Sequence, residues 1–438
     1  MTILRFAPSP TGRIHIGNAR TAILNWLLAQ KTGGQFILRF DDTDTVRSKV
    51  EYAESIAVDL EWMGIKPTRV EWQSKRIDKY HAAAEKLKAA GLLYACYETA
   101  DELDRKRKRQ AAKNLPPVYD RAALRLTAED RAALEAEGRK PHWRFKLDQN
   151  QVEWNDLIRG PSHVDTASQS DPVCIREDGT YLYTFCSVID DIEFGVTHVI
   201  RGEDHVVNTA VQMEITVALG GTVPIYGHHS WLVGPDGTGL SKRLGSLSIA
   251  SMREDGLEAM AVVSHAALLG TSDAIHPCPD YRELIDGFDL SKLSRAPARF
   301  DEADLKSLNA KLLHMLPWDA VKSRLDYGNE AFWLAVRGNL EKLSDAKLWH
   351  DVITNRINSV VAAEDREFVT GAIKDLPAEP WDSTTWKIWT DGLKASSGRK
   401  GKQLFMPLRL ALTGLDHGPE LAALLPLIGR QKVLDRLT

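Results

Sequence analysis

The segment PSPTGRIHIGNAR, residues 8–20, places a single histidine, His15, at the end of a loop rich in proline and glycine. Apolar residues then recur with helical spacing, so His15 stands at the start of a predicted helix. A helix N-terminus offers unpaired N–H groups and a partial positive charge, which suit a polyphosphate, and an imidazole beside it can donate a further hydrogen bond. The alternative interpretation is that His15 only caps the helix.

A second segment with phosphate-binding character is VGPDGTGLSKRLG, residues 233–245. Its glycines make the backbone pliant, and Lys242 and Arg243 place two cations near its centre. Such a loop can close on phosphates. The two segments together predict a nucleotide site in which backbone and His15 hold one side and Lys242 the other, so that a transferring nucleotidyl group is stabilised electrostatically.

The elements around these residues read as α/β in the first half of the chain. Strands are predicted over 3–7 and 35–40, with a helix over 16–32 between them, and the carboxyl ends of such parallel strands are where ligands bind. Ser9 and the acids 41–44 follow these strands. These residues also have purely structural interpretations. Arg5, in the first strand, could be a surface arginine, and the acids could form an N-cap cluster for the next helix, a role that suits Asp44 best.

Further along, residues 180–205 contain strand-like runs, one of which ends in Arg201. A helix is predicted over 208–219. Residues 81–113 are also predicted to be helical, and their basic run, 105–109, is most simply a solvated helix face. From about residue 250 helical periodicity continues to the end, so the C-terminal half is expected to be mostly helical.

Length and composition restrict the class of protein. A chain of 438 residues with a net charge of −4 fits two or three domains and argues against a uniformly basic nucleic-acid coat. The four cysteines form no C-x-x-C pair, and the sequence has neither a signal-peptide pattern nor a long uncharged run. We therefore expect a cytoplasmic protein that does not enter a membrane.

The motifs resemble those of class I aminoacyl-tRNA synthetases, and among them the bacterial glutamyl-tRNA synthetases. RFAPSPTGRIHIGNAR resembles the opening of that family, with residues 15–18 at the "HIGH" motif, and GLSKR, residues 239–243, resembles its "KMSKS" loop. The resemblance extends over nearly the whole chain. It continues in RFDDTD (39–44), VIDDIEFGVTHVIRGEDH (188–205), LSRAPARFD (293–301) and GRKGKQLFMPLRLALTG (398–414).

The resemblance implies an α/β Rossmann-type catalytic core with an acceptor-binding insertion, followed by a mostly α-helical C-terminal half. The implied domains are the first half of the core (1–80), the acceptor-stem insertion (81–180), the second half of the core (181–250), a stem-contact region (251–318) and an anticodon-binding region (319–438). The implied reaction uses ATP with Mg²⁺ to convert L-glutamate to glutamyl-adenylate, and then transfers the glutamyl group to tRNA. Neither step needs a side-chain nucleophile, which fits the absence of a Ser-His pair.

The same resemblance implies roles for individual residues. The implied catalytic residues are His15, Asn18 and Lys242. Glutamate is expected to meet Arg5 and Arg201 through its carboxylates, Asp41 through its ammonium group, and Ser9 and Tyr183 through hydrogen bonds, with Arg201 reading the γ-carboxylate and His205 beside the pocket. ATP is expected to contact His15, Gly17, Asn18, Glu203, Asp204, Leu240, Ser241, Lys242 and Arg243.

The chain departs from the family pattern at several positions. Gly239 replaces the first lysine of the "KMSKS" loop. Asn18 occupies the last position of the "HIGH" motif, and Ser187 stands where some relatives have a larger amide side chain. Some relatives bind zinc in the insertion through a cysteine cluster, but the partner cysteines are missing around Cys96 and Tyr119. No zinc or other structural metal is therefore expected.

Several alternatives stay open at this point. The expected partner is tRNA(Glu), and the sequence leaves open whether tRNA(Gln) is charged in addition; the protein is expected to be a monomer. A glutaminyl-tRNA synthetase is disfavoured because Arg201 would face a neutral amide. A shortened paralogue that glutamylates a modified tRNA base would lack the helical half, and a non-catalytic tRNA-binding paralogue would not need the retained His15 and Lys242.

Overall fold

The structure, a computed structural model, describes residues 1–240, 247–357 and 360–438. The chain divides into two compact units. Unit 1 comprises residues 1–254 and 262–301, and unit 2 comprises residues 255–261 and 302–438. We describe each unit by itself.

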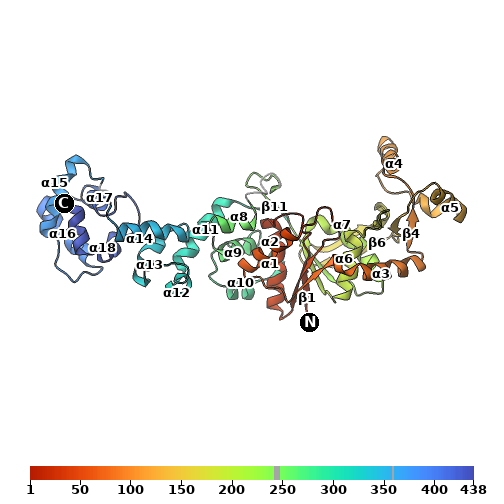
Figure 1. The fold of residues 1–438 in the computed structure, drawn as a ribbon, viewed down its shortest axis with the longest axis horizontal. Helices are drawn as coiled ribbons and strands as arrows, with labels where there is room; N and C mark the ends of the chain where they lie inside the picture. Colours follow the sequence, from red (N-terminus) through yellow and green to blue (C-terminus); the bar gives the residue numbers. More distant parts are fainter. Residues whose placement is uncertain (241–246, 358–359) are drawn as a thin grey trace. The chain divides into compact units, whose positions relative to one another are not determined.

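Unit 1 begins with a β-α-β-α-β arrangement (Figure 1). Strands β1 (Ile3–Phe6), β2 (Gln35–Phe40) and β3 (Arg69–Trp72) pair in parallel. Helix α1 (Ile16–Lys31) connects β1 to β2, and ten of its sixteen residues are buried. The predicted β-α-β unit is therefore confirmed: the apolar face of α1 packs on β1 and β2, whose residues are largely buried.

The second half of this core contributes another parallel pair, β9 (His198–Gly202) and β10 (Ile225–His229). Strand β9 lies beside β1, since the Thr197 N–H donates to the Ile3 carbonyl at 3.0 Å. Helices α6 (Tyr183–Glu193) and α7 (Val206–Ala218) flank these strands. Part of the strand-like region 180–205 is thus helical, while the strand ending near Arg201 is as predicted.

The expected helix over 81–113 is wrong as a single element. Helix α3 (Ile77–Ala89) ends before Gly91, whose φ of +70° lies in the left-handed region, and strand β4 (Leu93–Cys96) follows. All four residues of β4 are buried, and the strand pairs with β5 (His142–Phe145). Helix formation resumes only at α4 (Ala100–Ala112), so sheet pairing overrides the helical periodicity between them.

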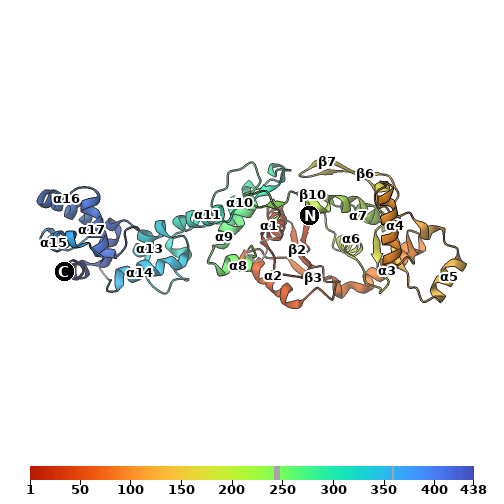
Figure 2. The same ribbon diagram turned by 90° about the horizontal axis from the view of Figure 1, so that it is seen from above.

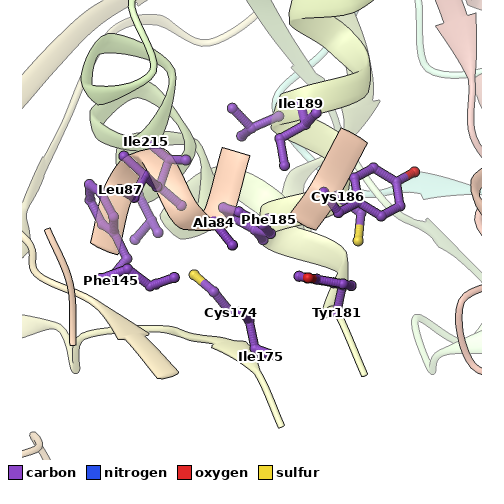
Figure 3. Packing of buried hydrophobic residues seen from close by; sticks show 14 of the residues in the cluster. Ala84, Leu87, Phe145, Cys174, Ile175, Tyr181, Phe185, Cys186, Ile189 and Ile215 are labelled. Carbon is purple, nitrogen blue, oxygen red and sulfur yellow. The ribbon is translucent and has the colours of Figure 1, made fainter. Parts of the chain in front are cut away.

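The region between the two core halves contains a small sheet and a hairpin. Strand β5 also pairs with β8 (Val173–Ile175), and β6 (Gln151–Asp156) pairs with β7 (Gly160–Asp165) as the hairpin. Figure 3 shows side chains from α3, α6 and α7 packing together with those of β5 and β8. Helix α4 has no buried residue, which agrees with a solvated basic face. Helix α5 (Ala128–Ala136) is likewise exposed.

The rest of unit 1 surrounds the sheet. Helix α2 (Val50–Trp62) is preceded by Lys49 as its N-cap, whereas Asp44 accepts from the Arg47 N–H and pairs with the Arg47 guanidinium. The suggestion that Asp44 caps the next helix is therefore wrong. The remaining elements here are β11 (Leu232–Val233), α8 (Ile249–Glu254), α10 (Tyr281–Gly287), β12 (Ala298–Arg299) and all but the first three residues of α9 (Ala259–Leu268).

Unit 2 is built of helices in the part that the structure describes (Figure 2). This confirms the helical C-terminal half. Trp333 and Trp389, both fully buried, are among its largest core side chains. Its helices are α11 (Glu302–Met315), α12 (Trp318–Val321), α13 (Glu330–Val336), α14 (Ala346–Thr354), α15 (Arg366–Gly371), α16 (Thr385–Ser397), α17 (Lys402–Thr413), α18 (Leu421–Ile428) and α19 (Arg430–Leu437).

Across the described ranges, none of the helices combines the length and the apolar character needed to cross a membrane. The four cysteines, Cys96, Cys174, Cys186 and Cys278, are buried and free.

Candidate active site

A cleft of about 880 Å³ lies in unit 1 beside the start of α1 and the carboxyl ends of β1, β9 and β10. Its volume is in the range of ordinary ligand pockets. Most of the predicted site residues that the structure describes meet here. The predicted residues that line the cleft are Arg5, Ser9, His15, Gly17, Asn18, Tyr183, Arg201, Asp204, His205 and Leu240.

His15 is both a helix cap and a possible ligand donor. It is the N-cap of α1, and its Nδ1 accepts a hydrogen bond from the Gly17 N–H at 3.1 Å. Because a nitrogen that accepts carries no proton, the ring proton is on Nε2, where it is available to a ligand. Burial lowers the pKa of His15, so the ring is neutral at pH 7. The two interpretations of His15 are therefore compatible.

Gly17 leaves room for the His15 ring. A Cβ at residue 17 would lie only 2.9 Å from the Cε1 atom of that ring. In this first turn of α1 the Ile16 N–H donates to the Leu247 carbonyl at 3.1 Å and the Gly17 N–H donates to His15 Nδ1, so the helix end acts on a ligand mainly through its partial positive charge. Asn18 is exposed at the same turn.

The glycine-rich loop reaches the cleft at both of its described ends. Gly239 and Leu240 line the cleft, and residues 247–249 pair with residues 14–16 through two backbone hydrogen bonds of 3.1 Å. The residues predicted to bind phosphates within the loop lie outside the described residues, and their roles stay predictions. These residues are Ser241, Lys242 and Arg243.

Arg5 presents part of its guanidinium to the cleft. Its side chain is buried, and its Nε donates to the Asp191 carboxylate at 3.2 Å. Asp191 also accepts from Arg39 Nη1 at 2.8 Å, so the carboxylate is fixed from two sides. The two terminal nitrogens of Arg5 have no hydrogen-bond partner among the described residues. Arg5 is thus an oriented cation with free donors, as recognition of a carboxylate needs.

Arg201 is held much more completely. Its side chain is 4 % exposed, and each of its five N–H groups has a partner. Three partners lie behind it in the protein interior and two line the cleft. The interior partners are His228 Nε2 (3.2 Å), Gln212 Oε1 (2.7 Å) and Thr209 Oγ1 (2.7 Å). The cleft partners are Tyr183 Oη and the His205 carbonyl, both at 3.3 Å.

The long contacts of Arg201 are the ones that a ligand could replace. Both lie on the cleft side, and both are at the long end of the range for N–H···O bonds. Burial, together with the charge of Arg201, lowers the pKa of His205 to about 4, so its ring is neutral. No partner of Arg201 is an ionised acid, and its positive charge is directed at the cleft without a counter-ion at hydrogen-bond distance.

Asp41 is not among the residues that line the cleft. Arg39, which is fully buried, binds both of its oxygens, with Nε at 2.7 Å from Oδ1 and Nη2 at 3.2 Å from Oδ2. Burial raises the pKa of Asp41 to about 6 against the opposing charge of Arg39, so the carboxylate is ionised at neutral pH. Ser187 is also buried and contacts Arg39 rather than the cleft. The ammonium-binding role of Asp41 stays a prediction.

Glu203 and Asp204 are adjacent in the sequence, but only Asp204 lines the cleft. Glu203 accepts from Arg159 Nη1 at 2.8 Å and from the Trp231 N–H at 3.0 Å, and it does not line the cleft. Asp204 does line it. Since Mg²⁺ usually binds one or two carboxylates together with phosphate oxygens and water, Asp204 is the cleft residue with suitable chemistry for the ion that accompanies ATP.

Several residues that line the cleft are not predicted from the sequence, among them Thr21, His229 and Trp231. Thr21 lies one turn after Gly17 on the same helix face, and its Oγ1 is 2.9 Å from His229 Nε2. Burial lowers the pKa of His229 to about 3, so this ring is neutral. The spacing of Thr21 from Gly17 could have indicated that it lies at the site, because residues four apart share a helix face. The end of the strand that carries His229 has no comparable motif.

Among the residues that the structure describes, two groups have ligand chemistry for a metal ion. In the insertion, Cys96, Glu98 and His142 have ligand atoms within 4.8 Å of one another. The expectation of no zinc considered only cysteines and did not include His142, which folding brings from a distant strand. That expectation stays a prediction. The second group comprises His276, Cys278 and Glu283, where the histidine Nε2 already pairs with the carboxylate at 2.8 Å.

The class of protein follows from three features of unit 1. These are the parallel sheet, the neutral histidine at a helix N-terminus and the two buried arginines of the cleft. Residues 2–307 match the family of class I tRNA synthetases (E and Q), catalytic domain. Residues 345–438 match the anticodon binding domain family. The chain belongs to the class I tRNA synthetases of this family, which confirms the fold class expected from the motifs.

Curated relatives and solved structures agree with this assignment. The chain is 56 % identical over 455 aligned residues to proteins of Brucella ovis, named glutamate–tRNA ligase 1, and Brucella melitensis, named glutamate–tRNA ligase 2, covering 100 % of both chains in each case. It also resembles the crystal structure of a glutamate tRNA ligase from Elizabethkingia meningosepticum in complex with its amino acid. That match has a TM-score of 0.85 and 27 % identity, and covers 100 % of this chain and 98 % of the other.

Proposed function

We propose that this protein is a glutamate–tRNA ligase that uses ATP to form glutamyl-adenylate and then transfers the glutamyl group to tRNA. The observation that carries this proposal is the cleft in unit 1, where two buried arginines stand beside a helix N-terminus capped by a neutral histidine. The helix end suits phosphates and the arginines suit carboxylates. The 56 % identity to proteins of that name, over their full length, supports it.

The proposed ATP site is built on α1 and the glycine-rich loop. His15 Nε2–H donates to the phosphates at the positive end of α1, with Gly17, Asn18 and Leu240 alongside. Asp204 offers a carboxylate to Mg²⁺, which supplies charge neutralisation for the phosphates when bound. We keep Ser241, Lys242 and Arg243 as the loop residues of this site, with Lys242 as its principal cation because Gly239 replaces the other lysine. Glu203 contributes indirectly, by holding the backbone of Trp231.

The proposed glutamate site uses the two arginines for different carboxylates. We assign the γ-carboxylate to Arg201, because its partners are uncharged and its two cleft-side contacts are long enough to be exchanged. Tyr183, which accepts from Arg201, can then donate its own proton to the substrate. Arg5 takes the α-carboxylate. Ser9 supplies a further hydrogen bond, and Asp41 remains our candidate for the ammonium group, although Asp41 would have to share its charge with Arg39.

Unit 2 is proposed to bind the anticodon arm, which the family match of residues 345–438 supports. The proposed partner is tRNA(Glu), with tRNA(Gln) as a second substrate, and the proposed state is a cytoplasmic monomer. The insertion between the two core halves is proposed to hold the acceptor end. The five-part domain division remains part of this proposal.

Aminoacylation with purified tRNA(Glu) and tRNA(Gln), each with glutamate and with glutamine, tests the reaction and its partner together. We expect glutamyl-tRNA(Glu). Glutaminyl-tRNA as the main product would favour a glutaminyl-tRNA synthetase, the alternative that the family description includes. No ATP-dependent charging of any tRNA in a total preparation would leave the non-catalytic tRNA-binding paralogue and would overturn the proposal.

A further inference from the structure

The residues behind Arg201 form a chain of buried hydrogen bonds that reaches into the insertion. His228, which is 0 % exposed, places its Nε2 at 3.2 Å from Arg201 Nε and its Nδ1 at 2.5 Å from Asp156 Oδ2. Asp156 is 2 % exposed. The order is therefore carboxylate, imidazole and guanidinium, and only the last of these lines the cleft.

The chemistry of Arg201 determines the tautomer of His228. An arginine Nε–H can only donate, so His228 Nε2 must accept and must carry no proton. The ring proton is then on Nδ1, where Asp156 accepts it. Burial lowers the pKa of His228, which agrees with a neutral ring. With this tautomer every donor in this row of hydrogen bonds faces an acceptor: Arg201 Nε–H faces His228 Nε2, and His228 Nδ1–H faces Asp156 Oδ2.

Asp156 is itself fixed by its surroundings. Its Oδ1 accepts from the backbone N–H groups of His228 (3.0 Å), Ile158 (3.0 Å) and Arg159 (2.9 Å), and its Oδ2 accepts from the imidazole at 2.5 Å and from Trp154 Nε1 at 3.3 Å. Burial alone would raise the pKa of Asp156, but the His228 and backbone hydrogen bonds outweigh it and hold that pKa well below its ordinary value. The carboxylate is therefore ionised and oriented at neutral pH.

We propose that Asp156 and His228 are positioning residues for the glutamate specificity of this enzyme: Asp156 selects the His228 tautomer that lets the ring accept from Arg201, and so fixes the guanidinium toward the cleft. The inference rests on the proposed role of Arg201. Neither residue touches the substrate.

The position of Asp156 in the fold gives this proposal a further consequence. Asp156 ends β6 in the β6–β7 hairpin, which belongs to the insertion rather than to either half of the core. The hairpin is attached to β10 at this point, where the Leu157 N–H donates to the Tyr226 carbonyl at 2.9 Å. The insertion therefore supplies part of the support of the amino-acid pocket, in addition to its proposed contact with tRNA.

Asp156→Asn is the sharpest test because it changes the donor pattern without changing the shape. Three backbone N–H groups point at Oδ1, so the asparagine oxygen must occupy that position and its NH₂ group must face His228. His228 then accepts at Nδ1 and carries its proton on Nε2, where it can donate to Thr209 Oγ1 at 2.9 Å but can no longer accept the Arg201 Nε–H. The guanidinium loses this support and meets a donor in its place, as with the wrong histidine tautomer in catalytic triads.

The full-length enzyme is assayed by aminoacylation with varied glutamate at saturating ATP and tRNA. We expect Asp156→Asn to raise the KM for glutamate about 10- to 100-fold, the effect of losing a hydrogen bond to a charged group, and to narrow the preference for glutamate over glutamine. The KM for ATP should stay within about twofold. The matched control is Asp165→Asn, an exposed acid in the same hairpin that caps Ala167, which should leave both KM values unchanged.

His228→Phe provides a second and independent measurement. It keeps a ring beside Tyr226 but removes the acceptor for Arg201, so the KM for glutamate should rise by a similar factor. Because Asp156 acts only through His228, Asp156→Asn should add no further rise in this background. If Asp156→Asn does not yield folded protein, His228→Phe alone decides the matter.

A wild-type KM for glutamate and an unchanged preference in the folded variants would overturn the proposal, even with a lower Tm, since the pair would then be only structural. Additive effects of the two substitutions would also overturn it. Failure of the proposed function is distinguishable, because it would appear as absent glutamyl-tRNA formation by the wild-type enzyme.

Discussion

Replacing Arg201 by leucine should change which amino acid the enzyme accepts. Glutamate and glutamine have nearly the same shape, so a pocket must separate them by charge and hydrogen bonding. In the structure, Arg201 has two cleft-side N–H groups, which now contact Tyr183 and the His205 carbonyl. A γ-carboxylate that takes both of them gains two charge-assisted hydrogen bonds.

The magnitude follows from these two hydrogen bonds. Each is worth about 1.5–3 kcal/mol, so the pair contributes about 3–6 kcal/mol, or roughly a 10²- to 10⁴-fold loss of kcat/KM for glutamate in Arg201→Leu. Glutamine cannot use the guanidinium in this way and should lose much less. The preference for glutamate should therefore shrink by most of that factor, whereas Arg5→Leu should reduce both substrates alike if Arg5 holds the α-carboxylate.

The loss of Arg201 also has a cost in stability that must be controlled. The substitution leaves Gln212 Oε1 without its partner, at about 1–3 kcal/mol, and leaves His228 Nε2 only the Thr209 hydroxyl at 2.9 Å, so the Tm should fall. Arg20→Leu is the matched control. Arg20 is buried to a similar extent and donates to the Ser230 and Leu269 carbonyls, so its loss should lower the Tm without changing the glutamate-to-glutamine ratio.

The assay is kcat/KM for glutamate and glutamine in each variant, measured by aminoacylation below the respective Tm. If Arg201→Leu keeps the full preference for glutamate, the assignment is wrong. If Arg5→Leu is instead the variant that relaxes the preference, the two arginines hold the opposite carboxylates.

The other predictions concern parts of the chain away from this pocket. Lys242→Ala should reduce adenylate formation about 100-fold or more while leaving tRNA binding nearly intact, and Arg243→Ala should be milder; unchanged ATP–pyrophosphate exchange with tRNA present would contradict this. Deletion of residues 320–438 should raise the KM for tRNA and weaken its salt dependence, because phosphate contacts release counterions, and wild-type charging at low tRNA would exclude that role. Purified protein should contain no stoichiometric zinc; bound zinc that is lost in Cys96→Ser or His142→Ala would refute this.

How far the sequence predicts the site depends on whether local pattern or distant packing determines each feature. The position of His15 at the start of α1 follows from loop composition and helical spacing alone, and the structure confirms it. The engagement of Asp41 by Arg39 could not be predicted in this way. The two residues are only two positions apart, but their pairing depends on burial between β2 and α6, where Asp191 also meets Arg39.

The support of Arg201 shows the same limit more clearly. The motif THVIRGEDH identifies Arg201 as a candidate, but nothing in its spacing points to Asp156, which lies 45 positions earlier in a hairpin of a different region. Only the attachment of β6 to β10 brings the two together. Likewise, the helix expected over 81–113 failed at β4, because the strand exists only through its pairing with β5.

The two arginines of the cleft differ in how their charge is balanced, and this difference bears on which of them selects the substrate. Arg5 shares the Asp191 carboxylate with Arg39, so part of its charge is already neutralised in the free enzyme. Arg201 is surrounded by a neutral imidazole, an amide, two hydroxyls and a carbonyl, and the carboxylate of Asp156 reaches it only through His228. A buried cation without an adjacent anion is unfavourable, and a ligand that brings a negative charge relieves it while a neutral amide does not. The neutral surroundings of Arg201 should therefore make the pocket favour an acidic ligand, which is the physical basis that we propose for a preference for glutamate over glutamine.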